Sequence, residues 1–302
     1  MKIKELFNDV EIDGEVQPRP MKPGLPYPRK IEFFSFEDKI LRKMLRFFAG
    51  QAARNNLLLI GPAGAGKTAL VEQIATRLGW PVWAVSCSGK VRASQWFGTF
   101  ALRDGATVWQ DGPLTLAMRN GGVFLADEIT RLDPAEQMAL VRVLDGGSVT
   151  IPETGEVIEP HKLFRFVATG NSGGFGDDAG VYVGERVSSF AFVDRFLKFS
   201  VGYLTEEQEE KLLARIVPGL GETPRKILVR LAQQIRKGFA GSGGGLRVNM
   251  STRALIAVAK EAYGYHTMGV ENPLMEAVED VILNGAPSDD GGAVKELIKK
   301  FL

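Results

Sequence analysis

One segment constrains the fold more than any other, because residues 61–68 complete the pattern G-x-x-x-x-G-K-[ST]. An apolar run at residues 57–60 precedes the segment and predicts a buried strand. Apolar residues then recur at helical spacing over residues 68–78, and Gly79 followed by Trp80-Pro81 ends that pattern. A strand, a glycine-rich turn and a helix in this order are typical of a loop that binds the phosphates of a nucleotide.

The residue types in this loop suit the chemistry of a phosphate site. Glycines allow successive backbone N–H groups to turn toward the phosphates, Lys67 reaches the terminal phosphates, and the Thr68 hydroxyl reaches Mg²⁺. The N-terminus of the following helix adds positive charge. The residues predicted to bind the nucleotide are Gly61, Pro62, Ala63, Gly64, Ala65, Gly66, Lys67, Thr68 and Ala69. The alternative is a glycine-rich turn without a ligand.

Composition limits the remaining classes. The chain has 302 residues, of which 45% are hydrophobic, and this length allows two domains that each bury a core. A net charge of +1 disfavours a nucleic acid as the main partner without excluding it. Cys87, His161 and His266 fit neither a disulfide framework nor a zinc signature, and we expect Cys87 to be buried. Without an apolar leader or a run of about 20 apolar residues, a cytoplasmic protein with no membrane contact is expected.

The chain divides into three predicted parts. Residues 1–35 contain five prolines and predict an extended arm that lies outside the core and wraps a neighbour. Residues 36–204, which open with a helix over residues 37–52, alternate strand and helix patterns and predict an α/β nucleotide-binding domain with a parallel sheet. A T-x-x-Q capping box at Thr205 then begins a helical domain over residues 205–302. The glycine-rich stretch 238–245 predicts a flexible loop between helices.

Two acidic residues end a second buried strand. The apolar residues 123–126 lead directly into Asp127 and Glu128, and active groups of open α/β sheets lie at the carboxyl ends of strands. We predict that Asp127 holds the magnesium through water and that Glu128 activates the attacking water as general base. The alternative is that the pair merely opens the next loop.

A helix is predicted to follow, up to Leu144. Asp133 is its N-cap, Pro134 occupies its first position, and Glu136 stands at the capping-box position. Gly146 closes it.

Two further polar residues follow apolar segments. A third strand at residues 164–169 leads into Asn171, whose amide would contact the γ-phosphate or orient the water, although Asn there is usually only a turn residue. Arg195 follows Asp194 in apolar surroundings, and the simplest reading is an Asp-Arg surface pair.

Taken in order, these features resemble Walker A, Walker B, sensor 1, the arginine finger and sensor 2 of an AAA+ ATPase, with Arg253 in the last position. Within that class the chain is similar to the MoxR group, and most similar to the CobS-type ATPase subunit of aerobic cobaltochelatase. The likeness also rests on residues 111–114, 176–182, 194–196 and 250–253. Proteins of this type also occur apart from cobalamin synthesis, including in bacteriophage genomes.

The resemblance implies a function and a fold. It implies hydrolysis of ATP with Mg²⁺, and an α/β P-loop AAA+ core, carrying inserted β-hairpins, followed by a small all-α lid. The catalytic residues would be Glu128, Asn171, Arg195 and Arg253, and the metal residues would be Thr68 and Asp127. Residues 99–109, turning at Asp104-Gly105, and residues 149–158, turning at Thr154-Gly155, are candidates for the hairpins, which would line a pore, face the client or be plain surface hairpins.

The resemblance also implies assembly. In this family the nucleotide lies between subunits of a ring, usually a hexamer, so Arg195 would reach the γ-phosphate held by the neighbouring subunit. Such an arginine supplied in trans is worth about 10³ to 10⁵ in turnover in other NTPases. Ser251 can cap a helix from Thr252 and direct Arg253 toward a nucleotide in its own or its neighbour's site. The simple alternative for Arg253 is a solvated charge.

Several functions compete. The leading hypothesis is a motor that remodels a client protein together with a von Willebrand A-domain partner. A second is a nucleic-acid motor, for which Lys90, Arg92 and Arg103 near the first hairpin are the only local hint. A third is a nucleotide-gated scaffold that hydrolyses slowly, against which Glu128 argues. A small-molecule kinase is disfavoured, because the sensor, finger and lid series would then lack a purpose.

Overall fold

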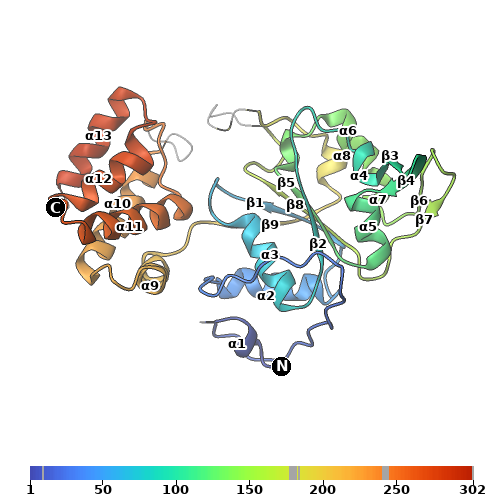
Figure 1. Ribbon diagram of the computed structural model, residues 1–302, viewed down its shortest axis with the longest axis horizontal. Helices are drawn as coiled ribbons and strands as arrows, with labels where there is room; N and C mark the ends of the chain where they lie inside the picture. The colour runs from blue at the N-terminus through green and yellow to red at the C-terminus, as the bar shows by residue number, and fades with distance from the viewer. Residues whose placement is uncertain (9, 177–181, 183, 240–244, 301–302) are drawn as a thin grey trace.

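The computed structural model describes residues 1–302 except 9, 177–181, 183, 240–244 and 301–302. It confirms the predicted P-loop α/β core with hairpins followed by an all-helical part. Figure 1 shows a sheet-containing body joined through a single linker to a bundle of helices that carries the C-terminus. The segment 176–182, on which part of the family resemblance rests, and the glycine-rich loop 238–245 lie largely outside the described residues.

The body is built on a five-stranded parallel sheet in the order β2-β5-β8-β1-β9. Its strands are β1 Asn56–Ile60, β2 Val82–Ser86, β5 Val123–Asp127, β8 Arg165–Gly170 and β9 Leu197–Ser200. Alternate residues of a strand enter different cores, as Leu57 and Leu59 contact one cluster while Leu58 contacts the other. The central strands are therefore apolar on both faces, which explains their unbroken hydrophobic runs.

Helices cover both faces of this sheet. On one face lie α2 Asp38–Phe48 and α3 Lys67–Arg77. On the other lie α4 Ser94–Phe97, α5 Pro113–Asn120, α6 Pro134–Ala139, α7 Val141–Leu144 and α8 Phe190–Val193. The helix expected over residues 37–52 ends at Phe48, because Gly50 adopts a left-handed φ of +72°.

The helix expected from Asp133 to Leu144 is divided at Leu140 into α6 and α7. Asp133 caps α6 through the N–H of Ala135 as predicted. The predicted capping box is wrong, because the Glu136 carboxylate instead accepts a hydrogen bond of 2.8 Å from the N–H of Ala93. Glu136 therefore joins α6 to the start of α4.

The N-terminal segment differs from the expected free arm. It contains α1 Ile3–Leu6, and its apolar side chains Ile3, Phe7, Val10 and Ile12 are buried in the same core as α2. The prolines only begin at residue 18, so they do not oppose burial of the residues before them. The first part of the segment is thus a core element of its own chain.

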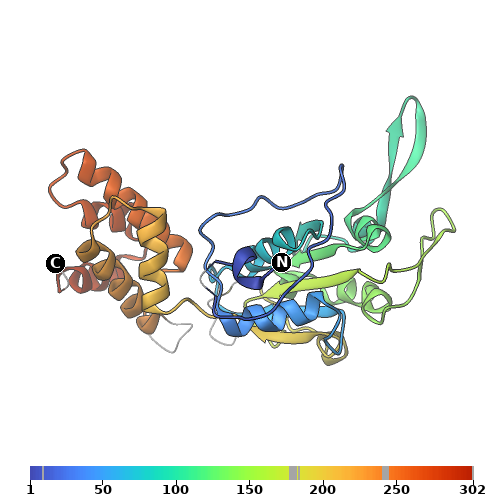
Figure 2. The same ribbon diagram turned by 90° about the horizontal axis from the view of Figure 1, so that it is seen from below.

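Both expected hairpins are present. β3 Gly98–Arg103 and β4 Ala106–Asp111 pair antiparallel, and Asp104 and Gly105 both have positive φ, as a two-residue turn requires. β6 Val149–Thr150 and β7 Val157–Ile158 form a shorter pair with a longer loop. In both views the hairpins project from the side of the body opposite the helical part (Figures 1 and 2).

The helical part has its own core. It comprises α9 Glu206–Ile216, α10 Glu222–Gly238, α11 Thr252–Thr267, α12 Pro273–Val278, the π-helical turn η3 Glu279–Leu283 and α13 Ser288–Lys299. The predicted capping box at Thr205 and Gln208 starts α9, and Ser251 caps α11 through the N–H of Ala254. None of the described helices combines the length and the hydrophobicity needed to span a bilayer.

Candidate nucleotide-binding site

The phosphate loop connects the end of β1 to α3. Gly66, with φ of +85°, is the N-cap of α3, and its carbonyl accepts the first backward hydrogen bond, 2.8 Å from the N–H of Leu70. The N–H groups of the first helical residues, Lys67 to Ala69, therefore have no acceptor within the helix. An anion at this end of α3 would satisfy them and would be favoured by the helix dipole.

Lys67 lies at the centre of the loop and is 7% exposed. Its ammonium group donates to the carbonyls of Gly61 at 2.7 Å and Pro62 at 3.0 Å, and to Oδ1 of Asn171 at 3.0 Å. Burial lowers the pKa of Lys67, although the negative charge of Asp127 opposes that shift. The structure thus brings the predicted sensor amide directly to the predicted phosphate-binding lysine.

The two acidic residues occupy different environments at the end of β5. Oδ1 of Asp127 accepts hydrogen bonds from the hydroxyls of Thr68 at 2.5 Å and Thr169 at 2.6 Å. Glu128 has a left-handed backbone with φ of +58°, and its carboxylate forms an ion pair of 2.9 Å with Arg131, in the short helical turn η1 Ile129–Arg131. The backbone turn at Glu128 directs its side chain differently from that of Asp127.

Sequence reasoning missed Thr169. This residue ends the predicted third strand and is fully buried. Its hydroxyl donates to Asp127 and accepts a hydrogen bond of 2.9 Å from the N–H of Glu128, so it holds both acids in place. The available signal was a polar side chain at the carboxyl end of a buried strand, one residue before the glycine that precedes Asn171.

Glu185 was also missed. Oε1 accepts hydrogen bonds from the hydroxyl of Thr130 at 2.9 Å and from the N–H of Asn171 at 3.2 Å, and Oε2 accepts one from the Ser172 hydroxyl. One carboxylate thereby fixes the loop of Asn171 against the segment that follows Glu128. No local pattern predicts this role, because Glu185 lies 14 residues beyond Asn171.

Arg253 reaches the same site from the helical part. It lines a cavity of about 140 Å³ together with the phosphate loop, both acids, Thr169 and Asn171. A side chain on Gly64 would lie 2.4 Å from Cβ of Ser251, so the start of α11 lies directly on the loop. Because small-ligand pockets usually measure about 300–1,000 Å³, this cavity accommodates only part of a nucleotide.

Arg195 lies elsewhere. Its carbonyl accepts a hydrogen bond of 3.1 Å from Asn56, the first residue of β1, whereas the phosphate loop follows the last residue, Ile60. Four residues of strand separate these points by roughly 13 Å. The guanidinium pairs with Asp145 at 2.7 Å, which confirms an Asp-Arg surface pair and identifies Asp145 as the partner. Hydrogen bonding to Asp145 raises the pKa of Arg195.

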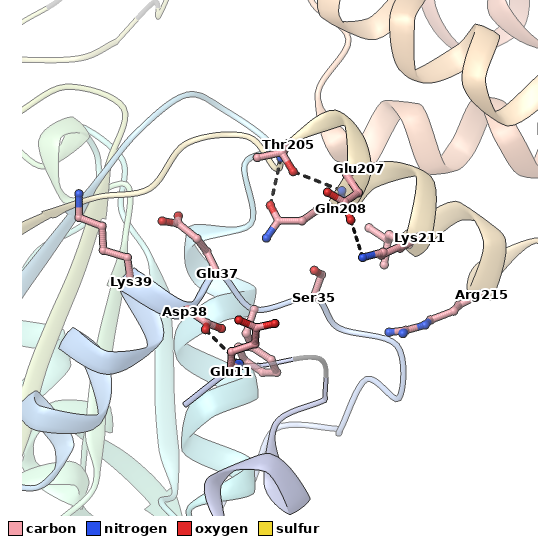
Figure 3. A pocket seen from close by; sticks show the side chains of 12 residues that line it. Glu11, Ser35, Glu37, Asp38, Lys39, Thr205, Glu207, Gln208, Lys211 and Arg215 are labelled. Carbon is pink, nitrogen blue, oxygen red and sulfur yellow. Dashed lines mark hydrogen bonds and ion pairs between the residues drawn. The ribbon is translucent and has the colours of Figure 1, made fainter. Parts of the chain in front are cut away.

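A larger cleft lies between the two parts of the chain (Figure 3). It has a volume of about 440 Å³ and is bounded by the N-terminal segment, the start of α2 and one side of α9. Acidic Glu11 and Asp38 line the body, and basic Lys211 and Arg215 project from α9. Both sides of the cleft carry mixed charge, because Lys39 also lies on the body side and Glu207 of α9 pairs with Lys211 at 2.7 Å.

The chain was compared with known families. Residues 56–196 match the family described as AAA domain (dynein-related subfamily), and residues 209–287 match the family CbbQ/NirQ/NorQ C-terminal. The two matches cover most of the sheet-containing body and most of the helical part.

Individual relatives agree with these families. The chain is 31% identical to aerobic cobaltochelatase subunit CobS of a Sinorhizobium species, over 72% of this chain and 68% of the relative. It is 34% identical to protein NorQ of Paracoccus denitrificans, over 69% and 74%, and 31% identical to protein CbbQ of Hydrogenophilus thermoluteolus, over 70% and 75%. A RuvB mutant from Thermotoga maritima has a similar fold, with a TM-score of 0.56 at 17% identity over 88% of this chain and 75% of that one.

Proposed function

Because this chain belongs to the AAA+ ATPases of the MoxR type, together with CobS, NorQ and CbbQ, we propose that its ATP hydrolysis drives remodelling of a client protein by a ring of subunits. The ring is a hexamer that works with a von Willebrand A-domain partner. One observation carries this proposal: Arg195 lies at the end of β1 opposite its own phosphate loop. A finger placed there serves a neighbouring subunit.

The residues of the loop and of β5 fit a magnesium-bound triphosphate. The Thr68 and Asp127 oxygens, 2.5 Å apart, are the hard oxygen ligands that Mg²⁺ prefers, directly or through water. The metal, when bound, neutralises charge on the phosphates. Lys67, which donates to loop carbonyls and to Asn171, turns its ammonium group to the phosphates when they enter.

The remaining side chains supply proton transfer and orientation. Glu128 accepts the proton of the attacking water, and Asn171 orients that water or the γ-phosphate, its backbone held by Glu185. Arg253 lines the cavity of its own chain, which supports action on its own nucleotide. The proposal also divides the chain into an α/β domain over residues 36–204 and a lid over residues 205–302, and the separate core of the helical part supports this division.

Assembly is tested by turnover at different protein concentrations. If Arg195 acts in trans, activity per subunit falls steeply on dilution, and Arg195→Ala lowers turnover by about 10³ to 10⁵ while nucleotide binding persists. Arg247→Ala is the control, because it removes an arginine of the helical part that also pairs with an aspartate and does not line the nucleotide cavity. Turnover that is independent of concentration contradicts the shared site.

Mixing two inactive variants gives a sharper test. Arg195→Ala retains Glu128, and Glu128→Gln retains the finger, so a mixed ring contains interfaces at which both groups are intact. A trans finger therefore predicts that the mixture regains turnover that neither variant shows alone. If the finger acts within one chain, the mixture stays inactive.

The first hairpin is the proposed client contact. Its side chains Phe100 and Leu102 are 52% and 76% exposed, and Arg119 of α5 pairs with Asp111 at its base and with Glu156 of the second hairpin. Exposed apolar side chains on a hairpin that is fixed by ion pairs at its base are suited to contact with another protein. Leu102→Ser is expected to abolish client-stimulated turnover and leave basal turnover intact.

The client and partner are identified by purification from the native host with Glu128→Gln, which binds ATP without hydrolysing it. Recovery of a von Willebrand A-domain protein supports the remodelling function. Recovery of nuclease-sensitive complexes with DNA-processing proteins, together with salt-dependent stimulation by DNA, favours a nucleic-acid motor instead. Very slow turnover by a stable ring would favour the nucleotide-gated scaffold.

A further inference from the structure

Tyr203 connects the phosphate loop to the helical part through one hydroxyl group. It lies in the linker between β9 and α9 and donates a hydrogen bond of 2.9 Å to the carbonyl of Ala63 in the loop. The same hydroxyl accepts a hydrogen bond of 2.8 Å from the amide of Asn249, two residues before the cap of α11. Burial raises the pKa of this phenol, so it stays a protonated donor at neutral pH.

A buried ion pair holds the ring of Tyr203. The guanidinium of Arg236, on α10, lies 4.2 Å from the ring centroid, where a cation is attracted to the aromatic face. Arg236 is 7% exposed and pairs with Glu209 of α9, which is fully buried, through contacts of 2.8 and 2.9 Å. Three helices of the bundle thus converge on the linker tyrosine, since Arg236 also donates to the carbonyl of Met250 just before α11.

This network leads directly to Arg253. Glu209 accepts a hydrogen bond of 2.7 Å from the hydroxyl of Thr252, the first residue of α11. Ser251, between Met250 and Thr252, lies against Gly64 of the loop. The residues on the N-terminal side of Arg253 are therefore fixed either to the loop or to groups that hold Tyr203.

We propose that Tyr203 is a positioning residue that sets the helical part against the phosphate loop and so places Arg253 in the nucleotide site. Tyr203 acts through this arrangement and not by touching the reacting atoms. The proposal rests on ATP binding at this site and is independent of the ring and its client. It predicts that the effects of Tyr203 and Arg253 on nucleotide affinity are coupled.

The test is a double-mutant cycle on the Kd for a fluorescent ATP analogue, with Tyr203→Phe and Arg253→Ala. Tyr203→Phe removes only the hydroxyl and keeps the ring under Arg236, so the melting temperature is expected to change little. Loss of two hydrogen bonds predicts a Kd about 5- to 150-fold higher. In the Arg253→Ala background the same change is expected to alter Kd by less than about 2-fold, since arginine placement no longer matters.

Tyr265→Phe is the matched control. Its hydroxyl also donates to a side chain, that of the exposed Asp280, but Tyr265 packs against the core of the helical part and neither residue lines the nucleotide cavity. If Tyr203→Phe destabilises the fold, Asn249→Ala replaces it, because this variant removes the lid partner of the hydroxyl and leaves the tyrosine. The same coupling to Arg253→Ala is then expected.

Two results would overturn the proposal: a Tyr203→Phe variant that binds as the control does, or effects of Tyr203→Phe and Arg253→Ala that simply multiply. Failure of the proposed function is seen separately, in the unaltered chain. In that chain it appears as absent turnover or absent assembly. The coupling between Tyr203→Phe and Arg253→Ala in Kd would still be observed. An unaltered chain that binds no nucleotide would contradict both the proposed function and the proposed role of Tyr203.

Discussion

Replacing Gly64 by alanine tests the contact between the phosphate loop and the start of α11. Gly64 has φ of +72°, and an added Cβ would lie 2.4 Å from Cβ and 2.5 Å from Oγ of Ser251. Carbon atoms in contact are ordinarily about 3.5–4.0 Å apart, so Ser251 has to withdraw by roughly 1 Å or more. Ser251 caps α11, and its movement carries Arg253 away from the cavity that Arg253 now lines with the loop.

The expected magnitude has two parts. A left-handed backbone costs alanine about 1–2 kcal/mol relative to glycine, which lowers stability whatever the surroundings. If Arg253 binds a phosphate as proposed, its withdrawal removes a hydrogen bond to a charged group, worth about 1.5–3 kcal/mol, or roughly 10- to 150-fold in affinity. Gly64→Ala is therefore expected to raise the KM for ATP by about that factor, in addition to a modest fall in melting temperature.

The variant Gly269→Ala separates the backbone cost from the effect of moving Arg253. Gly269 ends the same helix, has φ of +75°, and an added Cβ would meet no atom within 4 Å. This variant is expected to lower the melting temperature by a similar amount and to leave KM unchanged. Steady-state ATPase assays and thermal unfolding of both variants decide the matter, and a Gly64→Ala enzyme with normal KM and kcat would refute the contact as the cause.

Four further outcomes are expected. Thr169→Val keeps the shape but removes the hydroxyl between Asp127 and Glu128, so kcat falls by about 10- to 100-fold in a folded enzyme; an unchanged kcat would show that the hydroxyl is dispensable. Burial raises the pKa of the Cys87 thiol to about 12, so a thiol reagent at pH 8 reacts only after unfolding. The unfolded thiol ionises near pH 8.5, so the contribution of the buried neutral thiol to stability is fully present below that pH and is lost as pH rises toward about 12. The free energy of unfolding is therefore expected to be lower at pH 10 than at pH 8, as measured by denaturant titration at both values. Glu209→Gln leaves Arg236 as an unpaired buried charge and is expected to reduce the free energy of unfolding by about 3–5 kcal/mol in urea titrations, whereas Glu207→Gln, exposed on the same helix, is not.

The parts of the site that the sequence predicts are those carried by short segments. Residues 61–68 and the pair Asp127-Glu128 each follow an apolar run, and strand geometry places the carboxyl ends of neighbouring parallel strands at one edge. Asn171 belongs to the same group because β8 lies between β1 and β5. In each case a short sequence pattern was sufficient to predict where the residue lies, because the pattern places it at the carboxyl end of a strand.

The remaining contacts depend on segments that meet only after folding. Glu185 and Tyr203 belong to no local sequence motif. Glu185 contacts Asn171, which lies 14 residues away, and Tyr203 contacts Ala63, which lies 140 residues away. The N-terminal segment misled for a related reason, since its prolines dominate the composition while Phe7, outside the proline-rich stretch, is the residue that is fully buried. Composition averaged over a segment hides which positions pack.

The arrangement of the site separates two tasks along one strand. At the carboxyl end of β1, a single chain presents the loop, the acids, Asn171 and, across the linker, Arg253. At the amino end, the guanidinium of Arg195 is held by Asp145, and the Arg195 carbonyl lies against Asn56, about 13 Å along the strand from the start of the loop. In the proposed ring, we expect a subunit divided in this way to turn nucleotide over only where a neighbour's finger exchanges its aspartate for a phosphate. Because the Asp145 side chain is half exposed, that exchange is expected to cost little, so contact between subunits would control hydrolysis.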